Sequence, residues 1–77
     1  MLPAQCRMAR AALQIGVREL AEAAMVSTNT ITRFEKGEDL KERTIIAISA
    51  ALEAAGVQFL ADGETANGPG VALRSAK

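Results

Sequence analysis

The sequence predicts a mainly α fold, in which four short helices are followed by a C-terminal two-stranded β-hairpin. In four segments, apolar side chains recur every three or four residues and therefore share one face of a helix. Near the C-terminus, two short stretches place large apolar residues at alternate positions, on either side of a segment rich in turn formers, which is typical of a hairpin. With 77 residues and 49% hydrophobic content, the chain can form one small core.

A first helix is expected over residues 3–13. Pro3 suits the first turn of a helix, where an N–H would have no partner, and the residues after it are good helix formers. Residues 14–16 then form a link, with Gly16 near the start of the next helix. The apolar face of the first helix consists of Cys6, Ala9 and Leu13.

The second and third helices are expected over residues 17–24 and 28–36, with a tight turn between them. Ala21 provides the small side chain that two steeply crossing helices need where their backbones come closest. Ser27 can cap the third helix through its hydroxyl, and Gly37 suits the end of that helix. The side chains expected in the core from this region are Leu20, Ala21, Ala24, Val26, Ile31 and Phe34.

A fourth helix is expected over residues 42–55, where Gly56 ends it. Its buried stripe follows the helical spacing i, i+3 and i+7. With this helix, residues 1–56 form the helical part of the domain. The stripe consists of Ile45, Ile48 and Leu52.

The hairpin strands are expected at residues 57–60 and 71–74, joined by a loop over residues 61–70. Because an isolated hairpin is only marginally stable in water, this one should pack on the fourth helix or pair with a second subunit. Residues 57–74 are therefore an extension of the same domain, and residues 75–77 are a frayed tail.

Residues 15–37 have the layout of a helix-turn-helix, whose second helix lies in the major groove of DNA. Their spacing resembles that of the Cro and lambda-repressor-like superfamily of phage repressors, and the resemblance covers about residues 3–60. It implies a four-helix DNA-binding domain that regulates transcription in a bacterium or a phage. The matching residues are Glu19, Leu20, Ala21, Val26, Ser27, Thr30, Ile31, Arg33, Glu35 and Gly37.

The start of the third helix is the predicted surface for reading DNA bases. Asparagine can pair with adenine, threonine can bond to a base or contact the methyl group of thymine, and arginine can reach guanine or a phosphate. The other interpretation is a solvated polar helix face. The predicted base-reading residues are Ser27, Thr28, Asn29, Thr30 and Arg33.

A second set of residues is predicted to contact DNA phosphates. The resemblance implies such contacts for the segment after the third helix, although a generic charged loop competes because Glu38, Asp39 and Glu42 are interleaved with the basic residues. Where the family favours glutamine this chain has Val17, which can meet a phosphate only through its backbone N–H. The predicted phosphate contacts are Val17, Arg18, Lys36, Gly37, Lys41 and Arg43.

Two further positions take their meaning from the resemblance. Family members pair an arginine in the first helix with a glutamate at the end of the third, which implies a partly buried ion pair between Arg10 and Glu35; the other interpretation is two unpaired surface charges. The family also has glycine in the turn between the second and third helices, where Met25 stands here. A left-handed conformation at Met25 would cost on the order of 1 kcal/mol.

The composition argues against several classes of function. Nothing forms a nucleophile–base pair or a metal site, because there is no histidine and Cys6 is the single cysteine, so we expect no enzyme, metal or cofactor. Cys6 is expected to be a semi-buried thiol. No signal peptide or membrane span is evident, which predicts a cytoplasmic protein. Nine basic residues balance nine acidic ones, so non-specific affinity for DNA should be modest.

The sequence thus predicts a sequence-specific regulator that binds double-stranded DNA at a palindromic operator as a homodimer. Repression is the commoner mode in such small proteins, and the other mode is activation, with Glu19 or Glu22 contacting the polymerase. Residues 57–74 are a candidate dimer contact, although they could equally cap the core. The alternative is a helix-turn-helix protein-interaction module, such as an antiactivator or an antitoxin, with a second protein as partner. An apolar patch near Phe59, Val71 and Leu73 would favour that alternative.

Overall fold

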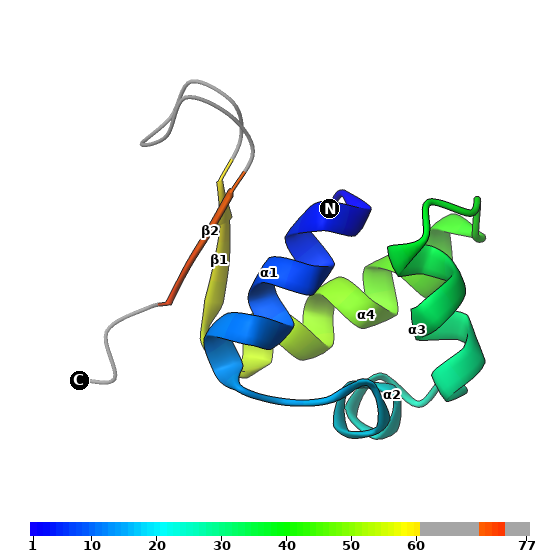
Figure 1. Cartoon of the computed structure of the whole chain (residues 1–77), viewed down its shortest axis with the longest axis horizontal. Helices are drawn as coiled ribbons and strands as arrows, with labels where there is room; N and C mark the ends of the chain where they lie inside the picture. The colour runs from blue at the N-terminus through cyan, green and yellow to red at the C-terminus, as the bar shows by residue number, and fades with distance from the viewer. Residues whose placement is uncertain (61–69, 74–77) are drawn as a thin grey trace.

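Four helices and an antiparallel hairpin follow one another along the chain, so the predicted mainly helical fold with a C-terminal hairpin is confirmed (Figure 1). The computed structural model describes residues 1–60 and 70–73. The expected loop except for Gly70, the last residue of the expected second strand (residue 74) and the expected tail therefore lie outside the described residues. The elements are α1 (Pro3–Leu13), α2 (Val17–Ala24), α3 (Thr28–Glu35), α4 (Glu42–Ala54), β1 (Val57–Leu60) and β2 (Gly70–Leu73).

The helix boundaries differ from the sequence prediction by one residue at two ends. Helix α3 ends at Glu35 and α4 at Ala54, because Lys36 and Ala55 are the cap residues that precede a left-handed glycine. Gly37 has φ 97° and Gly56 has φ 111°, so both take the conformation that a helix needs just beyond its cap. Gly70, expected in the loop, is the first residue of β2.

The core lies where the four helices and β1 meet. Apolar side chains expected to point inward from α1, α2, α3 and α4 are buried there, and Leu13, Val26 and Ile45 pack against them while partly exposed. Ala21 is 2% exposed, in keeping with a small residue at the crossing of α2 and α3. The buried apolar residues are Cys6, Ala9, Leu20, Ala21, Ala24, Ile31, Phe34, Ile48, Leu52 and Val57.

The hairpin is supported by α1 more than by α4. Strand β1 contacts both helices, whereas β2 lies against α1. Gln5 on α1 is 5% exposed, and its Nε2 donates to the backbone oxygens of Leu60 and Gly70, each at 3.0 Å. Its Oε1 accepts the N–H of Leu2 at 2.8 Å, so both ends of the buried amide are satisfied. The hairpin therefore packs on α4, as expected, but also on α1, which the sequence did not predict.

The turn between α2 and α3 contains a left-handed residue that is not glycine. Met25 has φ 61° and ψ 43°, and its side chain is 90% exposed. Its N–H closes the end of α2 by donating to the oxygen of Glu22 at 3.2 Å. Gln14 has the same conformation after α1, with φ 60°. The turn geometry expected from the family resemblance is thus kept, with the β-carbon of Met25 strained.

Replacing Met25 with glycine is expected to stabilise the protein by up to about 1 kcal/mol, because the strain of the β-carbon is removed and no packing is lost. Thermal unfolding of the two proteins measures the difference. Met25→Ala is the matched control, since alanine shortens the side chain and keeps the β-carbon. A glycine variant no more stable than the alanine variant would contradict the strain.

Candidate nucleic-acid interface

Helix α3 is fixed by its own cap and by two inward-facing side chains. The N–H of Thr30 donates to Oγ of Ser27 at 3.1 Å, and Ser27 is the N-cap residue, directly before the helix. Ile31 and Phe34 are 0% and 3% exposed, so they anchor the helix in the core. The opposite face of α3 is therefore left to polar side chains at the surface.

The predicted base-reading residues differ in how free their side chains are. Thr28 and Asn29 are exposed, and Asn29 makes no hydrogen bond through its side chain among the described residues. The hydroxyls of Ser27 and Thr30 lie 2.9 Å apart and share a hydrogen bond. Arg33 is exposed but paired, because its Nε donates to Oε1 of Glu38 at 2.8 Å.

A surface cleft of about 480 Å³ lies between α3 and the start of α4. It brings Ser27, Thr30 and Arg33 together with Lys41 and Arg43, which were predicted to contact phosphates. One acidic residue, Asp39, lines the cleft with these basic side chains. The remaining lining residues are Val26, Leu40 and Thr44.

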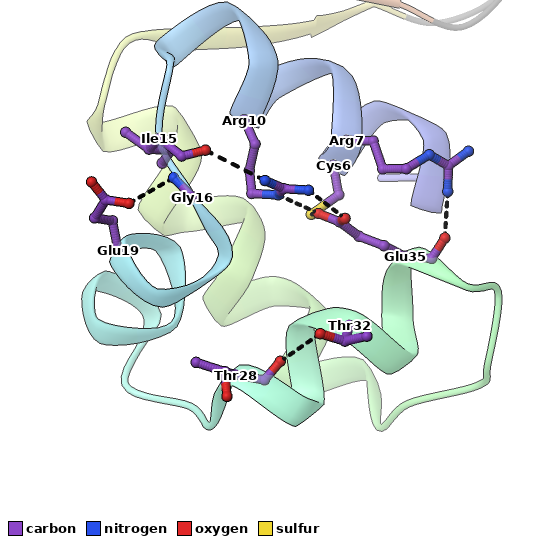
Figure 2. A network of polar contacts seen from close by, with 9 residues as sticks. All are labelled: Cys6, Arg7, Arg10, Ile15, Gly16, Glu19, Thr28, Thr32 and Glu35. Atoms are coloured by element: carbon purple, nitrogen blue, oxygen red, sulfur yellow. Dashed lines mark hydrogen bonds and ion pairs between the residues drawn. The ribbon is translucent and has the colours of Figure 1, made fainter.

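The other predicted phosphate contacts lie outside this cleft. Lys36 and Gly37 are exposed at the end of α3, and Arg18 is exposed on α2. Val17, in the first turn of α2, packs partly buried against the core, so its side chain has a structural role. The start of α2 is held instead by Glu19, whose Oε1 accepts the N–H of Gly16 at 2.7 Å (Figure 2).

An ion pair joins α1 to the end of α3 (Figure 2). Arg10 binds Glu35 with two hydrogen bonds, Nε to Oε2 at 2.7 Å and Nη2 to Oε1 at 2.8 Å. Such a bidentate pair fixes direction as well as distance. Arg10 also reaches the backbone oxygen of Ile15 at 3.4 Å, and Arg7 donates to the backbone oxygen of Glu35.

The pair is largely shielded from water, with side-chain exposures of 22% for Arg10 and 9% for Glu35. Burial alone would raise the pKa of the Glu35 carboxyl, but hydrogen bonds from Arg10 and Cys6 and the charges of Arg10 and Arg7 together lower it. The hydrogen bond to Glu35 raises the pKa of Arg10. Both groups therefore remain charged at neutral pH.

Cys6 completes this network as a hydrogen-bond donor. Its Sγ donates to Oε2 of Glu35 at 3.2 Å, and the residue is fully buried, whereas the sequence predicted a semi-buried thiol. Burial, followed by the hydrogen bond to Glu35 and its charge, raises the pKa of the thiol to about 12. The thiol therefore stays protonated, and a protonated thiol is a poor nucleophile.

Sequence reasoning did not identify Gln5 or the pairing of Arg33 with Glu38. One signal pointed to Gln5: it lies four residues before Ala9 and eight before Leu13, on the apolar face of α1. Within residues 1–60 and 70–73, no group of three or more potential ligands could hold a metal ion. No helix in those ranges is long and apolar enough to cross a membrane.

Two helices in a tight-turn arrangement, with the second one capped, braced and polar on its outer face, define a helix-turn-helix protein. The helix-turn-helix family model matches residues 7–55, from within α1 to the end of α4. The chain belongs to this family, a DNA-binding regulatory family of the Cro/C1 type, which indicates a DNA-binding transcription regulator. No curated protein is similar enough to the chain to count as a match.

Proposed function

We propose that this protein is a sequence-specific transcription regulator, acting as a repressor that binds a palindromic operator as a homodimer. The observation that carries the proposal is the outer face of α3: it is polar and exposed, while the same helix is anchored by Ile31, Phe34 and the pair of Glu35 with Arg10. A rigidly held helix with a free polar face is what readout in the major groove requires.

In this proposal the start of α3 enters the major groove, and residues outside the start of α3 contact the phosphate backbone of the DNA. Thr28 and Asn29 are the most accessible residues at the start of the helix, and Arg33 lies one turn further along. Lys41 and Arg43, across the shared cleft, supply charge for phosphates. Lys36, Gly37, Arg18 and the N–H of Val17 are proposed as further phosphate contacts.

Acidic residues set a limit on how tightly any DNA is held. Glu38, Asp39 and Glu42 are exposed between the basic residues of the same face. Because non-specific affinity rises with the number of phosphates neutralised, this face should bind random DNA weakly. Sequence recognition then depends more on base contacts than on charge.

The proposal is tested by selecting duplexes from a random oligonucleotide pool with the purified protein, at low and at physiological salt. Enrichment of a palindrome at physiological salt is the expected result, and half-sites about one helical turn apart would indicate a dimer. Titrating the selected duplex with protein and measuring the mass of the complex by sedimentation gives the number of chains bound to each duplex. Pools that stay random at both salt concentrations would overturn DNA recognition.

Arg33→Ala should weaken binding to the selected duplex by about 1–3 kcal/mol and relax the base preference at one position. Lys41→Ala is the comparison variant, because loss of a phosphate contact weakens all duplexes alike and lowers the salt slope by about 1. Thermal unfolding checks that both variants fold. Unchanged affinity and base preference in Arg33→Ala would show that Arg33 is not a base-reading residue.

A protein partner is the second candidate, and one surface favours it. A hollow of about 520 Å³ lies beside the hairpin, and Leu73, which pairs with Val57 across the sheet, is 54% exposed. Phe59 and Val71 pack against the core, however, so of the three residues of the expected apolar patch Leu73 is the exposed one. A selection that yields no DNA sequence would make this candidate the better one. The hollow is lined by Glu53, Ala54, Val57, Gln58 and Phe59.

A further inference from the structure

We infer that Glu38 is a positioning residue that presents Arg33 to a base rather than to a phosphate, and so sets the specificity of the interface. The inference rests on the proposed function. It starts from the 2.8 Å ion pair between Nε of Arg33 and Oε1 of Glu38. Glu38 itself lies outside the helix that carries Arg33.

The backbone fixes Glu38 over Arg33. After α3 the chain reverses at Gly37, whose N–H donates to the oxygen of Phe34 at 2.9 Å. The N–H of Glu38 then donates back to the oxygen of Arg33 at 3.1 Å. These two bonds form a Schellman motif, in which the residue after the left-handed glycine is held against the last turn of the helix. The carboxylate is therefore placed by the cap of α3.

The pairing leaves a defined part of the arginine free. Nε of Arg33 is occupied, whereas its two terminal nitrogens have no partner among the described residues, and 47% of the side chain is exposed. A guanidinium held through Nε presents its two terminal N–H groups in a fixed plane. That pair of donors matches the O6 and N7 acceptors at the major-groove edge of guanine.

Charge acts in the same direction as geometry. The carboxylate offsets the charge of Arg33, which reduces the attraction of the guanidinium to any phosphate regardless of sequence. Both side chains are about half exposed, at 47% and 51%, and such surface pairs contribute little to folding stability. We therefore expect the Arg33–Glu38 pair to contribute little to folding stability and to act mainly on DNA binding.

The test measures the ratio of affinities for the selected duplex and for a scrambled duplex of the same length. Glu38→Ala is expected to lower this ratio by about fivefold or more, on the scale of one bidentate base contact. Glu38→Gln keeps an oxygen acceptor for Nε and should recover part of the loss. Glu42→Ala is the matched control: it removes an exposed carboxylate nearby that is not paired with Arg33, and it should leave the ratio unchanged.

A double substitution separates positioning from general charge. In the Arg33→Ala background, Glu38→Ala should no longer change the ratio, because there is no guanidinium to position. An equal loss of ratio with and without Arg33, or an unchanged ratio in Glu38→Ala, would overturn the role of Glu38 while leaving DNA recognition intact. A wild-type protein that selects no duplex would overturn the proposed function and this inference with it.

Discussion

Glu35→Ala should lower the free energy of unfolding by about 3 kcal/mol, the lower end of the range for breaking a buried ion pair. The substitution leaves the guanidinium of Arg10 at 22% exposure without its carboxylate, and the thiol of Cys6 without its acceptor. For a domain of this size the loss corresponds to a fall in melting temperature of more than about 10 °C. Thermal and urea unfolding measure it.

The matched control is Glu38→Ala, which removes the carboxylate of the protein's other arginine–glutamate pair among the described residues. That pair is about half exposed, so its loss should cost less than about 1 kcal/mol. Comparable losses in the two variants would mean that the shielding of the Arg10 pair has no energetic consequence. Because Arg10 and Glu35 join α1 to α3, Glu35→Ala should also weaken DNA binding.

The same pair gives a pH dependence with a definite sign. The pKa of Glu35 in the folded protein lies below its ordinary value of 4.5. Its stabilising contribution is therefore fully present above that value and is lost as the pH falls through the lower pKa of the folded state. The stability difference between wild type and Glu35→Ala should accordingly be constant near neutral pH and should shrink in acid.

Gln5→Leu should cost about 2–4 kcal/mol, because the backbone oxygens of Leu60 and Gly70 both lose a buried donor. Leucine has nearly the volume of glutamine, so the loss reflects hydrogen bonding more than packing. The hairpin should loosen before the helices do. Urea unfolding gives the overall cost, and amide hydrogen exchange shows whether the β1–β2 ladder exchanges faster.

Gln58→Leu is the control for this variant, since it makes the same change at an exposed position on β1. It should alter stability by less than about 0.5 kcal/mol. If the two variants lost equal stability, the bonds of Gln5 to the hairpin would not be what holds the strands on α1.

The helices could be predicted because their signals are local. The spacing of Ile31 and Phe34, the cap at Ser27 and the glycine at 37 act within one or two turns, and each recurs in the structure. The one-residue differences at the ends of α3 and α4 arise because a left-handed glycine follows the cap residue and does not occupy it.

In the candidate site, too, contacts between residues far apart in the sequence could not be predicted from local signals. Arg10 and Glu35 are 25 positions apart, and only the family resemblance suggested that they meet. Arg33 and Glu38 are close in sequence, but their contact depends on the reversal at Gly37, which periodicity does not encode. The role of Gln5 was not predicted because its partners are backbone oxygens of two strands far from it in the sequence.

The position of Gln5 has a consequence for the order in which the molecule folds. Its two strand partners lie 55 and 65 residues further along the chain. Of the four helices, α1 is synthesised first, yet Nε2 of Gln5 cannot make its two native hydrogen bonds until both strands have been made and paired. Contacts of such long range form slowly, because a long loop must close before they can stabilise anything. During synthesis, the native contacts of α1 through Gln5 can therefore form only after β2 has been made.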